Sequence, residues 1–272
     1  MINEVPLVMG DLKLAERYYG GDLDAQLITE LHAREQAEPL TNKIGWWLPE
    51  YAIQKLSLES ELLVQPRTFM MHHVEAVLRN NLLEFLGHSE LNSMLDELTL
   101  PPEGKVIEPR ERSALLAALR SLLVEGAPIV LKDIVAAWPQ VRATYPHLRA
   151  QVEALRSLPS IRHRLPGNDG KHQLFEIGPK FESELRRNLY DPEGVPLLSL
   201  VPDRCQEMLA EVRNELPSDR RAAPAAIVVN DGPLRPHLRD LTKLEWPSVP
   251  VLALTELRDD VMTSPRSRIE LE

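Results

Sequence analysis

The chain has 272 residues, of which 43% are hydrophobic and 26% charged, so it can bury the cores of two or three compact units. Its 41 acidic and 31 basic residues give a formal net charge of −10, which argues against non-specific binding to nucleic acid or anionic lipid. The single cysteine, Cys205, excludes an internal disulfide and a cysteine-rich zinc site, and no apolar run reaches the roughly 18 residues of a membrane-spanning helix.

The first part of the chain mixes strand and helix patterns, and we predict a mixed α/β unit over residues 1–66. A helical pattern covers residues 24–38 and stops at Pro39, because proline cannot continue a helix. The apolar segment 42–66 has strand-like pieces at both ends, with room for a short helix between them.

A helical period follows, and we predict an all-helical domain over residues 67–165. Its first helix should end at Gly87 and turn an apolar stripe toward the core. That stripe consists of Met71, Val74, Leu78, Leu82 and Phe85. A second helix begins at Ser89, and a third holds Pro109 in its first turn, where proline is tolerated. Leu119 is central to the leucine stripe of the third helix, so we expect it to be buried.

A loop of sequence RLPGNDGK, residues 164–171, is interpreted as a polar turn at a domain boundary. After it strands alternate with helices, which predicts a small α/β domain over residues 166–272. The expected strands are residues 172–177, 225–230 and 249–254. The last two are too apolar to be water-facing edges, so we expect them to pair inside one sheet. The predicted fold class is therefore α+β multidomain, with an all-helical middle domain and a small α/β C-terminal domain.

The sequence holds little that predicts catalysis, and we expect no enzyme, cofactor or metal site. His72 and His73 are adjacent on a helix and point about 100° apart, so they cannot easily share a metal. The GNDGK segment lacks the spacing of a phosphate-binding loop. As an alternative we keep an enzyme on the α/β domain, built from His172, Asp231 and His237, because strand ends of such sheets often carry sites.

Arginines recur every seven residues at Arg142, Arg149 and Arg156. On one face they could bind an acidic partner or a neighbouring subunit. The alternative is a solvated surface, on which Glu153 pairs with Arg149 and Arg156 along the helix.

Four stretches, taken in order, resemble the motifs of one family. They are IGWWLPEYAIQKLSLESELLVQPRTFMMHHVEAVL (44–78), HHVEAVLRNNLLEFLGHSELNSMLDEL (72–98), ERSALLAALRSLLVEGAPIVLKDIVAAW (111–138) and VVNDGPLRPHLRDLTKLEWPSVPVLALTEL (228–257). The third resembles the pattern L-L-x-E-G, and the fourth resembles R-x-x-(L/V)-R-x-(L/I)-x-x-x-x-(F/L)-P-x-(L/V)-(P/A)-V-L-S-Y-x-E. These patterns are similar to those of the FHIPEP family of type III export-gate proteins, which comprises flagellar FlhA and injectisome SctV proteins.

The resemblance implies a cytoplasmic protein-interaction module of a type III protein export apparatus, at the cytoplasmic face of the bacterial inner membrane. It would form a ring of like subunits and dock export chaperones, export substrates and other export-apparatus proteins. The tail SPRSRIELE favours the injectisome SctV branch slightly. Because the family's membrane half has no counterpart in the sequence, we interpret residues 1–66 as the remnant of a partial α/β subdomain. A degenerate structural remnant is a further alternative.

A ring also implies a head-to-tail contact between subunits. The resemblance points to the polar side of the first helix, with Glu75, Arg79 and Glu84 as candidate contacts, and to Arg149 and Arg156 as further ones. Such a contact is normally helped by membrane anchors, so we expect the free chain to be a monomer at about 10 μM.

Overall fold

The computed structural model describes residues 14–39, 44–56, 58, 60–98, 107–191, 195–217, 224–262 and 267–271. The chain folds into two compact units, residues 1–85 and 86–272. The division falls at Phe85, so the first helix of the expected helical domain belongs to the first unit. The α+β multidomain fold class is confirmed, with β-sheets in both units and a cluster of helices in the second.

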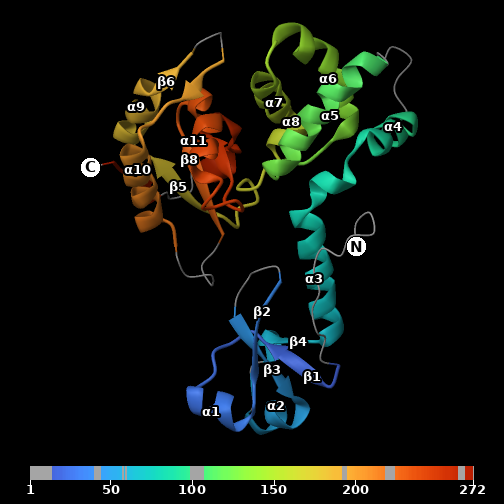
Figure 1. The fold of residues 1–272 in the computed structure, drawn as a ribbon, viewed down its shortest axis with the longest axis vertical. Helices are drawn as coiled ribbons and strands as arrows, with labels where there is room; N and C mark the ends of the chain where they lie inside the picture. Colours follow the sequence, from blue (N-terminus) through green and yellow to red (C-terminus); the bar gives the residue numbers. More distant parts are fainter. Residues whose placement is uncertain are drawn as a thin grey trace. The chain divides into compact units, whose positions relative to one another are not determined.

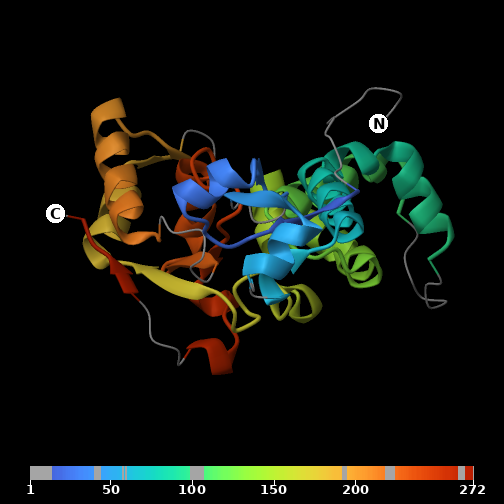
Figure 2. The ribbon, with the colours of Figure 1, turned by 90° about the horizontal axis from the view of Figure 1, so that it is seen from below.

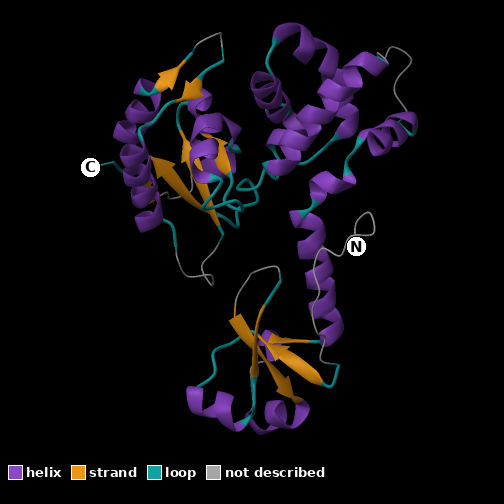
Figure 3. Cartoon of the chain, in the orientation of Figure 1, coloured by secondary structure: helices purple, strands orange, loops and turns teal. Residues whose placement is uncertain are grey.

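The first unit contains a four-stranded antiparallel sheet with the strand order β2-β3-β1-β4. Its elements run β1, α1, β2, β3, α2, β4, which is the split β-α-β-β-α-β arrangement. They are β1 (Glu16–Tyr19), α1 (Ala25–Glu30), β2 (Arg34–Ala37), β3 (Ile44–Pro49), α2 (Glu50–Leu56), the 3₁₀ turn η1 (Ser60–Leu62) and β4 (Leu63–Val64). The strand–helix–strand order expected for residues 42–66 is thereby confirmed. Figure 3 shows the two short helices together on one side of the sheet.

The helix expected over residues 24–38 is shorter than predicted. Asp24 caps it by accepting a hydrogen bond from the Gln26 amide at 3.3 Å, and α1 ends at Glu30. The chain then turns through His32, whose φ is +50°, and continues as β2 against β3. Cross-strand pairing overrides the helical period here, because local propensity is weaker than tertiary contact.

The first turn of the helix α3 (Pro66–Asn80) packs on the face of this sheet opposite α1 and α2 through one aromatic cluster. Tyr18 and Tyr19 point to opposite faces, as neighbours in a strand do. Tyr19 joins the core beneath the short helices, whereas Tyr18 meets Trp47 and Phe69 of α3. The three ring centroids are 4.8–5.8 Å apart, within the range of favourable aromatic pairs.

The apolar stripe of this helix does not face a core as predicted. Met71 is 60% exposed and Val74 is 51% exposed, and Leu78, Leu82 and Phe85 are exposed as well. Phe69 takes the buried position instead. The helix also ends at Asn80 rather than Gly87, and a 3₁₀ turn, η2 (Leu82–Phe85), follows it.

The second unit begins with a helical half, which we define as residues 86–165. Its helices are α4 (His88–Asp96), α5 (Pro109–Val124), α6 (Leu131–Thr144), α7 (Leu148–Arg156) and α8 (Pro159–Arg162). Pro109 is the first residue of α5, as the sequence predicts, and Gly126 after its end has a φ of +68°. Leu119 is fully buried, which confirms the register of that helix.

The α/β half, defined as residues 166–271, carries a four-stranded parallel sheet in the order β10-β5-β8-β9. Its elements are β5 (Gln173–Ile177), α9 (Pro179–Arg187), β6 (Leu189–Tyr190), β7 (Leu197–Leu198), α10 (Pro202–Glu215), β8 (Ala225–Val229), η3 (Gly232–Leu234), α11 (Arg235–Thr242), β9 (Val251–Ala253), η4 (Leu254–Glu256), α12 (Asp259–Met262) and β10 (Ser267–Ile269). Val251 and Leu252 pair with residues 227 and 228, as expected. Within the described residues β9 is the outermost strand on its side, but residues 251–253 are buried, so this edge does not face water, as expected.

Each face of the parallel sheet belongs to a different core. Phe175, Ile227 and Val251 pack under α9, α10 and α11. The alternate residues Leu174 and Val228 face the other way and join the core of the helical half. Figures 1 and 2 show α9 and α10 on the side of the sheet that faces away from the helical half. The two halves of the second unit therefore share one hydrophobic core.

The loop at residues 164–171 is packed into that shared core. Asn168 is 2% exposed, and its amide nitrogen donates to the carbonyls of Arg162 and Glu256 at 2.8 Å. Its side-chain oxygen accepts from the Arg258 amide at 3.0 Å. Gly167 has a φ of +100°, and a Cβ there would lie 2.5 Å from Leu252. Leu165, Gly167 and Asn168 of the expected polar turn are therefore buried, whereas Arg164 and residues 169–171 are exposed.

Candidate functional site

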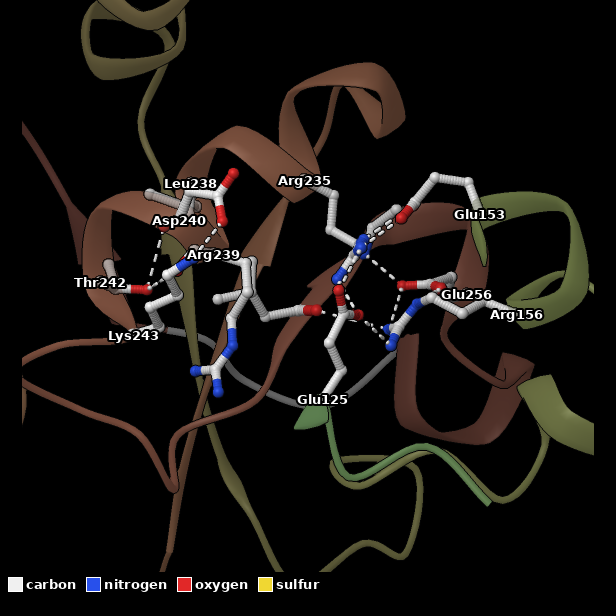
Figure 4. Close-up of polar contacts among 12 residues, drawn as sticks. Glu125, Glu153, Arg156, Arg235, Leu238, Arg239, Asp240, Thr242, Lys243 and Glu256 are labelled. Atoms are coloured by element: carbon white, nitrogen blue, oxygen red, sulfur yellow. Dashed lines mark hydrogen bonds and ion pairs between the residues drawn. The ribbon is translucent and has the colours of Figure 1, made fainter. Parts of the chain in front are cut away.

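Charged side chains gather where the helical half meets the α/β half, and Figure 4 shows them. We call this set the ionic junction; its members are Glu125 at the end of α5, Glu153 and Arg156 on α7, Arg235 at the start of α11 and Glu256 in η4. They are brought together by the fold alone, because the separations between bonded partners from different elements run from 31 to 110 residues.

Two guanidinium groups share one carboxylate at the centre of the junction. Arg235 Nη1 and Arg156 Nη1 each donate to Glu125 Oε2 at 2.8 Å. Arg235 Nε also donates to Glu153 at 2.8 Å, while Arg156 binds both oxygens of Glu256 at 2.8 and 3.1 Å. Such two-pronged contacts fix orientation as well as distance.

Burial makes these contacts obligatory. Arg235 is 1% exposed and Arg156 is 2% exposed, and an unpaired buried ion costs several kcal/mol. Burial alone would lower the pKa of Arg235, but Glu153 and Glu125 outweigh it and raise that pKa, so the guanidinium keeps its charge. Glu153 shows the opposite balance: burial raises its pKa even though Arg235 and Arg156 pull it down.

The local sequence explains how each group is presented. Glu125 is the C-cap residue of α5, directly before Gly126. Glu153 and Arg156 are three residues apart on α7, so they project from one side of that helix. Glu256 accepts a hydrogen bond from the Ala253 amide at 2.8 Å, which closes the turn η4 after β9.

Other polar contacts extend the junction along α11. Arg239 is 6% exposed and donates to the carbonyls of Trp246, Pro247 and Val249 at 2.8–3.2 Å, which holds the loop before β9. The α11 residue Asp240 accepts from Arg149 of α7 at 2.6 Å. The Arg149–Asp240 bond joins the same two halves at a second place.

His237 lies beside the Arg149–Asp240 bond. Its Nδ1 is 3.3 Å from Arg149 Nη1, and the imidazole is almost fully buried. Burial lowers the pKa of His237, and the nearby Arg149 charge lowers it further. The ring is therefore neutral at neutral pH and can accept the arginine hydrogen bond.

The structure corrects one predicted contact residue and locates the others. Arg156 is buried in the ionic junction, so it cannot serve as a surface contact for a partner. Arg149 is half-buried and occupied by Asp240. Glu84 is exposed in η2, whereas Glu75 on α3 is half-buried. The side chain of Arg79 lies outside what the structure describes.

The alternative enzyme cluster is not assembled. His172 lies before β5 at the amino end of the parallel sheet, where its Nδ1 is 2.8 Å from Asp169. Asp231 follows β8 at the carboxyl end and accepts from Arg186. His237 contacts Arg149 instead of either of them. These three side chains therefore do not meet around one substrate, as acid–base catalysis requires.

Sequence reasoning passed over Glu125, Arg235 and Glu256 as functional residues, although all three stand in the stretches that carry the family resemblance. The signal that could have found them is a charge inside an apolar stretch. Arg235 opens a mostly buried helix, and Glu256 lies three residues after the end of the apolar strand β9.

Together these features define a multidomain α+β protein whose buried charges join parts of the molecule. The model of the FHIPEP family matches residues 1–262, and the chain belongs to this family of type III export-gate proteins. None of the helices within the described ranges is long and apolar enough to cross a membrane.

Individual relatives agree with that assignment. The chain is 22% identical over 254 residues to the flagellar biosynthesis protein FlhA of Caulobacter vibrioides, covering 89% of this chain and 35% of FlhA. It thus spans about a third of the length of this curated relative.

Solved structures share the fold. The CdsV protein of Chlamydia pneumoniae matches with a TM-score of 0.75 and 19% identity, over 99% of this chain and 79% of that one. CdsV in a structure with CdsO matches with a TM-score of 0.73 and 20% identity, over 98% and 78% of the two chains. The nonameric SctV-C of EPEC matches with a TM-score of 0.65 and 17% identity, over 96% and 78%.

Proposed function

We propose that this chain is a cytoplasmic interaction module of a type III protein export gate, working at the cytoplasmic face of the bacterial inner membrane. In this proposal it joins a ring of like subunits and receives export chaperones with their substrates. The injectisome branch is the preferred setting, on the sequence of the C-terminal tail. Family membership supports the general role.

The ionic junction is the observation that carries the proposal. Three of its five residues, Glu125, Arg235 and Glu256, lie in the stretches that resemble the family, and the junction fixes the α/β half on the helical half. A module that presents surfaces to several partners needs such fixed geometry, because loosely held parts lose affinity to ordering entropy. CdsV, which shares this fold, has been solved with the protein CdsO, which supports a role in binding other proteins.

The exposed stripe of α3 is our candidate for the contact between like subunits. It presents Met71, Val74, Leu78, Leu82 and Phe85 to the surface. Contiguous apolar patches are uncommon on monomers and often mark binding sites. The nonameric SctV-C supports a ring, and Glu75, Arg79 and Glu84 on the same segment would set its register through charge.

Sedimentation of the chain, alone and fused to a ring-forming scaffold, tests the ring. We expect a monomer at about 10 μM for the free chain and discrete oligomers for the fusion. Val74→Glu should abolish the oligomers, whereas the control Val124→Glu should keep them, because the two valines are 51% and 53% exposed but only the first lies in the stripe. A tight two-fold dimer of the free chain would contradict the ring.

Pull-downs test the docking role separately. The chain, carried on the same scaffold, should retain export chaperones or other export-apparatus proteins from a lysate of its source cells, identified by mass spectrometry. Failure to retain them, while a full-length relative does, would reject docking by this chain without touching the ring.

A further inference from the structure

A buried histidine stands at the second place where α11 is joined to α7. His237 is 3% exposed, and its Nδ1 lies 3.3 Å from Arg149 Nη1, while Arg149 Nη2 donates to Asp240 Oδ2 at 2.6 Å. One guanidinium group therefore bonds two residues of α11. Because a guanidinium only donates, Nδ1 must be the unprotonated nitrogen of the ring, and the ring proton lies on Nε2.

A proton on Nδ1 would reverse this contact. An imidazolium carries a proton on each nitrogen, so two donors and two positive charges would face each other across 3.3 Å, and like charges at that distance repel. The imidazole is enclosed by the fold, whereas the Arg149 side chain is 32% exposed. Arg149 is therefore the partner that moves, toward solvent.

Asp240 is placed to take over from Arg149. It follows His237 by three residues on α11, and residues three apart are neighbours on a helix. A carboxylate favours the charged form of a nearby imidazole, and Lys243 of the same segment already donates to Asp240 at 2.7 Å. Asp240 therefore keeps cationic partners on its own segment when Arg149 leaves.

The charged groups that act on His237 are Arg149, Asp240 and Arg235. Arg235 is held by the carboxylates of the ionic junction. The strand β9 and the turn η3 also pack on α11, and neither contains an ionisable residue. On α10, which packs on α11 as well, Arg213 forms its ion pair beyond the end of α11. The charge of the imidazole therefore responds to the contact with α7 and to Asp240.

A pocket of about 180 Å³ opens beside this contact, so solvent reaches both residues that flank the imidazole. Arg149 and Asp240 line the pocket, together with Glu125 and Glu153. The last two carboxylates are bonded to Arg235 within the ionic junction. Asp240 is therefore the carboxylate of this pocket that a charged imidazole can take as its partner.

We propose that His237 is an acid-sensitive switch at the contact between α7 and α11. The neutral imidazole holds Arg149, whereas the imidazolium repels it and takes Asp240 as its partner. The ionic junction contains no histidine, so the two halves stay joined there. Acid therefore releases the first turn of α7, which carries Arg149, and leaves the rest of the second unit folded.

The pKa of His237 has the direction that such a switch requires. Burial lowers the pKa from its ordinary 6.5, the Arg149 charge lowers it further, and the Asp240 charge raises it in part. A histidine with a lowered pKa contributes stability that is fully present above about pH 6.5 and is lost as the pH falls through the folded-state pKa. The switch therefore acts below neutral pH.

Nuclear magnetic resonance titration of the histidine rings tests the contacts on either side of the switch. Arg149→Met should raise the pKa of His237, because it removes the donor and the charge that oppose protonation. Asp240→Asn should lower that pKa, because it removes the favourable carboxylate. Arg213→Met is the control and should leave it unchanged, since Arg213 pairs with Glu245.

Hydrogen exchange of α7 tests the release itself. About one pH unit below the midpoint of the His237 titration, the protection factors of residues 151–153 should be at least about threefold lower than at about pH 7.5. In His237→Asn they should stay constant, because the amide oxygen accepts from Arg149 and does not titrate. His163→Gln is the matched control and should behave as wild type. His163 also lies beside an arginine, with its Nε2 3.4 Å from Arg162 Nη2, but it is exposed.

Three results would overturn the switch. The first is a pKa of His237 that is the same in Arg149→Met as in wild type, and the second is one that does not fall in Asp240→Asn. The third is an equal loss of protection at residues 151–153 in His237→Asn, which would assign the loss to general destabilisation by acid. If His237→Asn does not fold, His237→Gln replaces it, and the titration needs no change at His237.

Discussion

Each unit of the molecule fastens a helix to a sheet, but the two do so with different chemistry. In the first unit, Phe69 of α3 packs on Tyr18 and Trp47. In the second, the buried Arg156 of α7 and Arg235 of α11 meet on the half-buried carboxylate of Glu125. Apolar contacts tolerate conservative changes of side-chain shape at a modest loss of stability. Removing one member of a buried set of ions costs more, because it leaves a buried charge unpaired. The difference separates a contact that mainly supplies stability from one that mainly fixes orientation.

Removing one arginine from the ionic junction should have the largest effect. Arg235→Met leaves Glu153 and part of the Glu125 pairing uncompensated, and we expect the second unit to lose about 3–5 kcal/mol. Native-state hydrogen exchange, which reports each unit separately, measures it. Arg213→Met is the control, because Arg213 forms an exposed pair with Glu245 and should cost less than about 1 kcal/mol. Equal losses in the two variants would remove the distinction between buried and exposed pairs.

An apolar deletion in the same unit gives the reference for ordinary packing. Leu119→Ala should cost about 2–5 kcal/mol, because the side chain is fully buried at the centre of α5. Leu148→Ala is the matched control, since that leucine is 41% exposed and its loss should be small. Chemical denaturation followed by circular dichroism measures both. A loss below about 1 kcal/mol for Leu119→Ala would mean that the helical half relaxes around the cavity.

A conservative change in the aromatic contact should cost less stability than the loss of a buried arginine. Phe69→Leu keeps an apolar group against Tyr18 and Trp47, so we expect a loss of about 1–2 kcal/mol confined to the first unit. Hydrogen exchange of β1 and β3 measures it. Phe85→Leu serves as the control, because Phe85 is exposed and its change should be close to neutral. A loss of stability as large as that of Arg235→Met would mean that the aromatic contact is as sensitive to a single change as the buried ions are.

Glu153→Gln should have the smallest effect, below about 1 kcal/mol at neutral pH, because Arg235 keeps its bonds to Glu125. The Glu153 pKa is raised from its ordinary 4.5, so the folded state favours the protonated side chain. The stability that this protonation contributes is present at low pH and is lost as the pH rises through the folded-state pKa. The free energy of unfolding of the variant should therefore rise relative to that of wild type as the pH goes from about 4.5 to 7. Urea denaturation at both pH values measures this trend, and the opposite slope would mean that Arg235 outweighs burial.

The comparison also shows where sequence reasoning succeeds. The spacing of the leucines in α5 identifies a buried face, because this spacing is a local feature of one helix. Pro109 and Gly126 mark the ends of the helix. The strands β5 and β8 are found for the same reason, since apolar runs between turns are local features.

The rest depends on contacts that no local pattern contains. The stripe on α3 and η2 has helical periodicity, but periodicity does not say which partner covers it, and among the described residues it stays exposed. The seven-residue arginine repeat predicts a shared face, yet Arg156 binds Glu256, which is 100 residues away. Such pairs become visible only when the fold brings distant turns together. The family resemblance located the right stretches without indicating that their charges meet.

The partly buried loop at residues 164–171 bears on how the second unit moves. A hinge needs backbone that can change its torsion angles freely, and this connection has none to spare: Asn168 is bonded on both sides, and Gly167 lies against Leu252. Swinging one half away would break the bond from Asn168 to the Arg162 carbonyl, which joins the two halves, and would open the shared core. We therefore expect the two halves to move together, so that a partner that pulls on the α/β half also moves the helical half.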